Sequence, residues 1–156
     1  MHWSIYIDRS VRDVFAVVAD RHQDRLWQRR VSSCAEAPGP GSGLGACYEI
    51  RQRPLPLAPQ VTTRAELITL EPPQVIAWRQ LDRLAASLVR YEVTPHGSQA
   101  CFTQRRQVDW QIPRHLRPWA ERWLRRSVSQ EMLALKRRLE SWATKSELEA
   151  LLEQLP

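Results

Sequence analysis

The segment CFTQRRQVDW, residues 101–110, has the residue types and spacing best suited to chemistry on a small molecule. Because successive side chains of a strand point to opposite faces, one face holds Phe102, Gln104, Arg106, Val108 and Trp110. This face is the more apolar of the two, and we expect it to point inward. A guanidinium on such a face would polarise a ligand carbonyl or stabilise an enolate.

Two tyrosines lie in strand-like segments that precede this one. Tyr91 shares a face with Val89 and Val93, and Tyr48 lies between Ala46 and Ile50. A tyrosine hydroxyl would donate a proton to a ligand or orient it. Together with an inward arginine, such a hydroxyl is the minimum that an aldol-type ring closure needs.

The candidates for catalysis are therefore Arg106, Tyr91 and Tyr48, but a purely structural interpretation competes with this one. In that interpretation Arg106 lies near a strand end and pairs with a surface carboxylate, while the two tyrosines are core aromatics. The sequence contains no His–Asp or paired-carboxylate arrangement that would identify an enzyme. Enzymatic activity thus stays an open alternative.

Tryptophans add apolar walls to the same set of residues. Trp78, Trp110 and Trp123 either contact a ligand or belong to the core, which is the commoner place for tryptophan. Trp27 is expected to pack against the short helices that precede it. Polar groups among apolar walls are typical of a small-molecule pocket. The predicted ligand-binding residues are Tyr48, Trp78, Val89, Tyr91, Phe102, Gln104, Arg106, Val108, Trp110 and Trp123.

The elements that must position these residues follow from periodicity. Residues 2–8 alternate as a half-buried strand, and Ser10 precedes a short amphipathic helix. Asp20 then caps a second short turn that ends on Trp27. From residue 29 to residue 110 the patterns predict six antiparallel strands. Residues 53–59 are predicted as a proline-stiffened hairpin connection, with a polyproline ligand as the alternative.

The last third of the chain is predicted to be helical from about Pro118. One broad apolar face recurs at steps of three and four residues. Ser146 and Glu149 have the spacing of a capping box, which predicts that residues 144–156 form either a separate short helix or a bent continuation. The face comprises Ala120, Trp123, Leu124, Val128, Glu131, Leu135, Leu139 and Trp142.

The stretch GSGLGA, residues 41–46, satisfies the dinucleotide-binding pattern G-x-G-x-x-[G/A]. Those glycines bind a pyrophosphate only between a buried strand and a helix N-terminus. Here Pro38, Gly39 and Pro40 precede the stretch and a strand pattern follows it. We therefore predict no dinucleotide cofactor.

Composition limits the remaining classes of function. The 156 residues make one domain, residues 1–156, with 43% hydrophobic and 26% charged residues. No apolar run approaches the ~18 residues of a membrane span, and no secretory signal is visible, so we expect a cytoplasmic protein. Three cysteines and four histidines are scattered without ligand spacing, so we expect neither a metal nor a disulfide framework.

The segment RHLRPWAERWLRR, residues 114–126, contains five arginines against one glutamate, in a chain of net charge +6. Arginine beside tryptophan suits an anionic membrane surface or RNA. The alternative is a packed helix whose arginines coat its solvent side. The predicted anionic-surface residues are Arg114, Arg117, Trp119, Arg122, Arg125 and Arg126.

The whole pattern resembles the START-like superfamily (SRPBCC), specifically its polyketide cyclase/dehydrase branch. The resemblance rests on IYIDRSVRDVFAVVAD with Trp27 beyond it, GLGACYE, EPPQVIAWRQ, VRYEVTPHGSQACF and LALKRRLESW, and it covers nearly the whole chain. It implies an α+β helix-grip fold, in which a curved antiparallel sheet wraps a long C-terminal helix.

The same resemblance implies a cavity between sheet and helix that holds a hydrophobic small molecule, polyketide-, quinone- or lipid-like. Members of the superfamily share no catalytic residue set, so the resemblance transfers no residue role to this sequence. Fold alone does not decide function.

Overall fold

The structure is a computed structural model that describes the backbone of residues 1–39 and 41–152 and the side chains of residues 1–39 and 41–141. Within this part of the chain, seven strands form one antiparallel sheet in the order β1-β7-β6-β5-β4-β3-β2. The strands are β1 (His2–Ile7), β2 (Val31–Glu36), β3 (Cys47–Gln52), β4 (Val61–Glu71), β5 (Val75–Leu81), β6 (Ala85–His96) and β7 (Gln99–Trp110).

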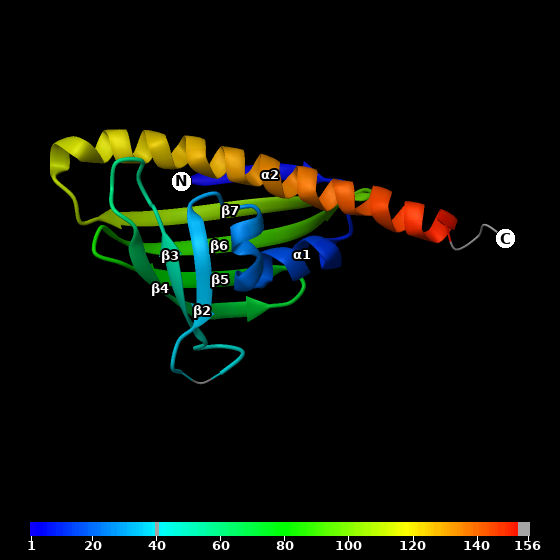
Figure 1. Cartoon of the computed structure of the whole chain (residues 1–156), viewed down its shortest axis with the longest axis horizontal. Coiled ribbons are helices and arrows are strands. Elements are labelled where there is room, and N and C mark those ends of the chain that lie inside the picture. The colour runs from blue at the N-terminus through cyan, green and yellow to red at the C-terminus, as the bar shows by residue number, and fades with distance from the viewer. Residues whose placement is uncertain (40, 153–156) are drawn as a thin grey trace.

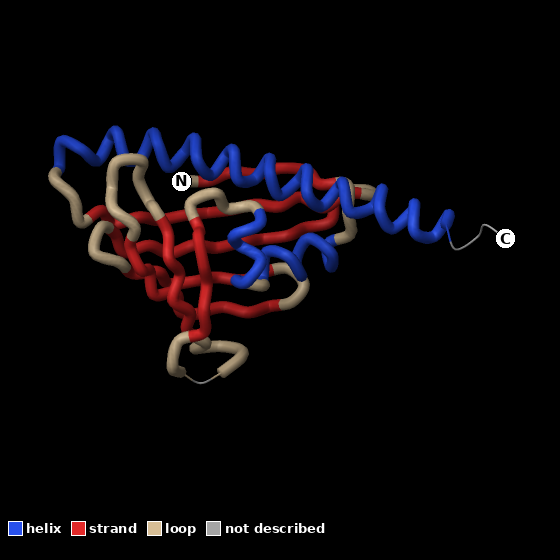
Figure 2. Tube along the Cα trace, viewed as in Figure 1, coloured by secondary structure: helices blue, strands red, loops and turns tan. Residues whose placement is uncertain are grey.

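Helices cover one side of this curved sheet, as Figures 1 and 2 show. They are α1 (Val11–Ala19), the 3-10 helices η1 (Arg21–Leu26) and η2 (Arg114–Leu116), and α2 (Arg117–Leu152). The predicted α+β helix-grip fold is confirmed: one strand, two short helices, six strands and a long final helix follow each other in that order.

The two short helices begin where the sequence predicts. The Ser10 hydroxyl accepts a hydrogen bond from the backbone N–H of Asp13 (3.1 Å) and so caps α1. The Asp20 carboxylate accepts one from the N–H of His22 (2.9 Å) and caps η1. The two short helices connect β1, at one edge of the sheet, to β2, at the other edge. Trp27, which ends η1, is buried as expected.

Of the two alternatives for residues 144–156, the separate short helix is wrong, because α2 runs without interruption to Leu152. Residues 143–152 contain neither glycine nor proline, and most are strong helix formers. Extending an existing helix adds one hydrogen bond per residue, whereas a new helix needs a costly nucleus. The capping-box spacing at Ser146 is therefore overridden. The Trp142 side chain and residues 153–156 lie outside the described part.

The helix α2 is fastened to the β1 edge by polar contacts as well as apolar ones. Its buried side chains include Leu124, Val128, Leu135 and Leu139. The Lys136 ammonium donates a hydrogen bond to the carbonyl of Tyr6 in β1 (2.7 Å). Neither α1 nor α2, as far as the structure describes them, combines the length and apolarity that crossing a bilayer requires.

The GSGLGA stretch lies in the connection between β2 and β3, as the flanking sequence predicts. Gly41, Gly43 and Gly45 have φ values of 81°, 101° and 85°, which side-chain-bearing residues rarely adopt. The N–H of Gly45 donates to the carbonyl of Leu67 in β4 (2.8 Å). The glycines thus serve a tight connection between strands, and β3 follows them in place of a helix.

Candidate ligand-binding site

The inner face of β7 carries the predicted alternation. Phe102, Gln104, Arg106 and Trp110 are all buried, and Val108 is half-buried. Antiparallel pairing aligns Arg106 with Val89 of β6 and, one strand further, Trp78 of β5. The sheet therefore presents this arginine to the space under α2.

Arg106 is an unpaired charge in the interior. Arg106 is only 6% exposed, and its Nε has no hydrogen-bond partner. Among the described residues it forms no ion pair, so the alternative of a surface salt bridge is wrong. Burial, and next the positive charge of Arg30, lower the pKa of Arg106 to about 10. The group is still protonated at neutral pH, where burying an unpaired charge is costly.

A second buried arginine, Arg30, has a partner. Arg30 lies immediately before β2 and donates two hydrogen bonds to Glu131 of α2, from Nε to Oε1 (2.7 Å) and from Nη2 to Oε2 (3.0 Å). Burial acts to lower the pKa of Arg30, but the charge and hydrogen bonds of Glu131 outweigh it and raise that pKa. The pair ties the far edge of the sheet to the helix.

A third buried arginine, Arg21, belongs to η1. Its Nη1 donates to Oδ2 of Asp24 (2.6 Å), and its guanidinium lies 4.2 Å from the ring centroid of Trp78. Both side chains of the ion pair are almost fully buried. Burial acts to lower the pKa of Arg21, yet the charge of Asp24 outweighs it and the pKa is raised. Arg21 Nε and Nη2 and Asp24 Oδ1 have no partner.

Tyr91 lies among these charges and is fully buried. Its hydroxyl accepts a hydrogen bond from the Gln28 amide (3.4 Å), and its ring contacts the rings of Trp27 and Phe102. Burial raises the pKa of Tyr91, so its hydroxyl keeps its proton at neutral pH. Gln104, on the same strand face as Arg106, leaves its Oε1 without a partner.

Tyr48 is half-buried and lies toward η1. Its ring packs edge-on against Trp78 (centroids 5.7 Å apart) and against His22 (6.0 Å). Burial raises the pKa of this hydroxyl too. Tyr48 therefore shares Trp78 with Arg21, whereas Tyr91 shares its surroundings with Trp27 and Phe102.

We call this set of buried polar residues the interior polar cluster. It holds three arginines against two carboxylates, so its net charge is +1, and Arg106 is the arginine without a partner. The cluster consists of Arg21, Asp24, Gln28, Arg30, Tyr91, Gln104, Arg106 and Glu131.

A pocket of about 220 Å³ opens onto the cluster from the surface. Arg53 and Pro56 of the β3–β4 loop line one wall, Trp123 lines the other, and the Arg30–Glu131 pair is part of the lining. Of the predicted ligand-binding residues, Trp123 lines this opening. The rings of Trp27, Tyr91 and Phe102 are buried and contact each other, and none of them lines this pocket.

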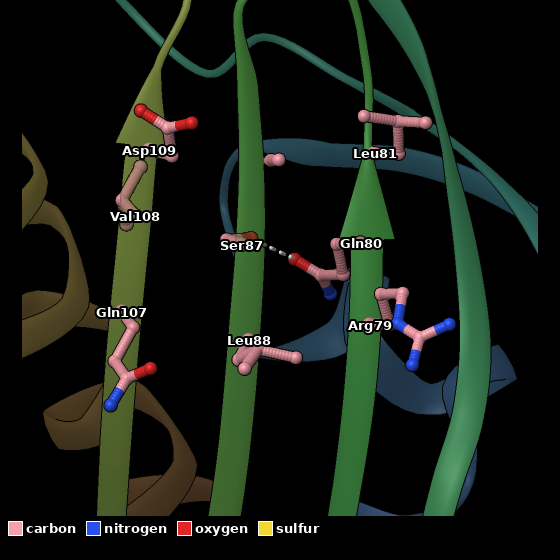
Figure 3. A pocket seen from close by; sticks show the side chains of 9 residues that line it. Arg79, Gln80, Leu81, Ser87, Leu88, Gln107, Val108 and Asp109 are labelled. Carbon is pink, nitrogen blue, oxygen red and sulfur yellow. Dashed lines mark hydrogen bonds between the residues drawn. The ribbon is translucent and has the colours of Figure 1, made fainter.

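A second pocket, of about 470 Å³, lies over three neighbouring strands at one end of the sheet (Figure 3). Its residues form three consecutive rows of the strand register, one of them Gln80, Ser87 and Val108. The Ser87 hydroxyl donates a hydrogen bond to the side-chain amide oxygen of Gln80, Oε1, at 3.5 Å. Val108 is the one predicted ligand-binding residue in its lining, and the interior polar cluster takes no part in it.

Sequence reasoning missed five of the eight members of the cluster: Arg21, Asp24, Gln28, Arg30 and Glu131. One signal was present, because Glu131 falls on the apolar face of the final helix. A carboxylate at such a position needs a buried partner. Nothing in the sequence pointed to Arg30 as that partner, since the two residues are 101 positions apart.

The predicted anionic-surface residues lie at the start of α2 and just before it. Arg114, Arg122, Arg125 and Arg126 are exposed, and Trp119 is 43% exposed. Arg117 differs, because it is half-buried and its Nε donates to the carbonyl of Ile112 (3.4 Å). Within the described residues, no group of three or more His, Cys, Asp or Glu side chains could hold a metal ion.

Comparison with known proteins agrees with this architecture. A START superfamily protein from Mycobacterium smegmatis superposes with a TM-score of 0.76 at 12% identity, covering 91% of this chain and 97% of that one. The Zhui aromatase/cyclase from a Streptomyces species gives 0.69 at 15% identity, covering 90% and 92%. The di-domain ARO/CYC StfQ of the steffimycin pathway gives 0.71 at 14% identity, covering 92% of this chain and 51% of that one.

At these identities the structural likeness establishes the fold alone. A search of curated proteins finds no match to this sequence. The sequence itself matches a family described as polyketide cyclase / dehydrase and lipid transport over residues 2–140, nearly its whole length. By this match, the chain belongs to the polyketide cyclase / dehydrase and lipid transport family.

Proposed function

We propose that this protein binds a hydrophobic, polyketide-like small molecule between sheet and helix, with a carbonyl or enolate oxygen of the ligand against Arg106. The observation that carries the proposal is the Arg106 guanidinium, which is buried and has no ion-pair partner among the described residues. A negatively charged ligand oxygen would be the counter-ion that Arg106 lacks among the described residues. Quinone- or lipid-like ligands with such an oxygen would satisfy the same site.

The route to Arg106 begins at the pocket between Pro56 and Trp123. A ligand entering there passes the Arg30–Glu131 pair and meets the rings of Trp27 and Tyr91, which must move apart to admit it. The predicted ligand-binding residues on the inner sheet face then surround it. Aromatic walls with a few polar groups suit a flat ligand.

Cyclase activity would need two groups, and the cluster holds both. The acidic C–H between the two carbonyls of a β-dicarbonyl substrate would lose its proton to water, and Arg106 would stabilise the oxygen of the enolate that forms. As the enolate carbon bonds to a second carbonyl carbon, the Tyr91 hydroxyl would give its proton to the oxygen of that carbonyl. The phenolate left behind would recover its proton from solvent or from the next substrate. Loss of water from the resulting alcohol is the corresponding dehydrase step.

Native mass spectrometry of the purified protein, followed by a screen of lipids and phenolic compounds, tests the binding proposal. We expect one small molecule per chain, and we expect Arg106→Met to lower its retention. Arg79→Met is the matched control, because Arg79 is exposed on the sheet. Equal retention by both variants, or no binding of any compound, would contradict the proposal.

A further inference from the structure

The solvent-facing side of α2 carries large apolar side chains among its arginines. Trp119, Arg122, Arg126, Leu133 and Arg137 follow each other at steps of three, four and seven residues, so they lie along one helix face. All five are exposed, Trp119 by 43% and Leu133 by 46%. We call these five residues the outer stripe.

An apolar loop tip lies beside this face. Arg53 and Pro56 of the β3–β4 loop line a pocket together with Trp123 and Ser127 of α2. Leu57 directly follows Pro56 and is 90% exposed. In Figure 1 this loop reaches the first half of α2, in agreement with the shared pocket. Leu57 thus adds an exposed apolar side chain to a side of the molecule that already exposes Trp119 and Leu133.

The charge of this side of the molecule is strongly positive. Residues 117–139 contain seven arginines and lysines against two glutamates. One of the two, Glu131, is buried and paired with Arg30, so Glu121 is the exposed one. Arg29 and Arg53, which are exposed, line pockets with Gln130 and so add to the same side.

We propose that the outer stripe and Leu57 form a docking surface for an anionic lipid bilayer. Leu57 and Trp119 enter the headgroup region, where amphipathic rings and apolar side chains are favoured, and Arg122, Arg126 and Arg137 bind lipid phosphates. A bilayer would bind the exposed Leu57 side chain in its apolar part. A nucleic acid would not, because its bases stack on planar groups and leucine has none. Docking in this way places the Pro56–Trp123 pocket at the membrane, and it does not depend on any ligand inside the protein.

Co-sedimentation with vesicles tests the proposal. One set of vesicles contains equimolar phosphatidylcholine and phosphatidylglycerol, and the other contains phosphatidylcholine alone. We expect the protein to sediment with the anionic vesicles at low salt and to dissociate from them as the salt concentration rises. We expect no sedimentation with the neutral vesicles. Each basic residue near an anionic surface contributes about fivefold to binding, so Arg122→Gln with Arg126→Gln should weaken binding about 25-fold. Leu57→Ser should weaken it at unchanged charge.

The matched control removes the same charge elsewhere. Arg12 lies on α1 and Arg79 on the sheet, and both are exposed. We expect Arg12→Gln with Arg79→Gln to bind vesicles nearly as well as the natural protein. All substituted side chains are exposed, so folding should be preserved, and circular dichroism checks it. Absence of sedimentation at low salt, an equal loss in the control, or full binding by Leu57→Ser would overturn the proposal. So would retention of homopolymeric RNA in place of vesicles.

Discussion

Arg30 and Glu131 join the far edge of the sheet to α2 by two hydrogen bonds, of 2.7 and 3.0 Å, in the protein interior. Arg106 adds to this neighbourhood a buried positive charge that has no such partner. Both arginines are positively charged and buried, but only Arg30 has a counter-ion. Disrupting the Arg30–Glu131 pair should therefore lower the stability of the protein, whereas removing the Arg106 charge should raise it.

Glu131→Leu should destabilise the protein strongly. The substitution leaves Arg30 buried and unpaired, and breaking a buried pair in this way typically costs about 3–5 kcal/mol of unfolding free energy. Adding Arg30→Met should recover most of the loss, since the pair is then replaced by apolar groups. Urea unfolding measures both.

The control for this cycle is an exposed pair. Arg79 and Glu66 lie 3.4 Å apart, with side chains 63% and 41% exposed. Glu66→Gln should change the unfolding free energy by no more than about 1 kcal/mol. A Glu131→Leu protein as stable as Glu66→Gln would show that the interior pair does not act as argued.

Binding of an anionic aromatic probe should be insensitive to pH near neutrality and should fall as pH rises through about 10. The reason is the pKa of Arg106, which burial and the charge of Arg30 lower to about 10. The four histidines are exposed, and none belongs to the interior polar cluster. Fluorescence of anilinonaphthalene sulfonate across this range measures the effect, and a midpoint near pH 6.5 would point to a histidine.

The same pKa fixes the sign of a stability effect. The folded protein gives up the Arg106 proton at lower pH than the unfolded chain does, so above about pH 10 the folded state binds fewer protons than the unfolded chain. The cost of burying this charge is therefore present in full at neutral pH and is relieved as pH rises through about 10. In Arg106→Met this contribution to the pH dependence of unfolding should vanish, and its persistence would assign the effect to another group.

Tyr91→Phe should separate chemistry from binding. The substitution removes one hydroxyl and its 3.4 Å hydrogen bond from Gln28, so the fold should lose no more than about 1.5 kcal/mol. If Tyr91 donates the proton, cyclisation of a linear β-polyketone thioester should slow by about 10²–10⁴-fold. Single-turnover product analysis by mass spectrometry measures the rate. Tyr48→Phe is the comparison, and a rate that only Tyr48→Phe lowers would transfer the role to that residue.

Local patterns in the sequence were sufficient for the fold and for one wall of the candidate site. Strand alternation placed Phe102, Gln104 and Arg106 on the inner face, because a period of two leaves only one choice once the apolar face is known. The capping residues Ser10 and Asp20 marked both short helices, since their side chains bond to N–H groups two or three residues away.

The partners of the charges could not be found in this way. The Arg30–Glu131 pair is a tertiary contact between residues 101 positions apart, and no local period connects them. The separate short helix considered for residues 144–156 is wrong for a related reason. A capping-box spacing at Ser146 is local, whereas the continuity of α2 depends on the helix already formed before it.

The central claim is that the buried charge of Arg106 binds an oxygen atom of the ligand, and Arg106→Met tests this claim most directly. Two aromatic probes are compared by fluorescence, anionic anilinonaphthalene sulfonate and neutral phenylnaphthylamine, alongside urea unfolding of the free protein. We expect the variant to bind the anionic probe at least about tenfold more weakly, to bind the neutral probe unchanged, and to be more stable than the natural protein by about 1 kcal/mol or more. A variant that is less stable and binds both probes as the natural protein does would contradict the claim.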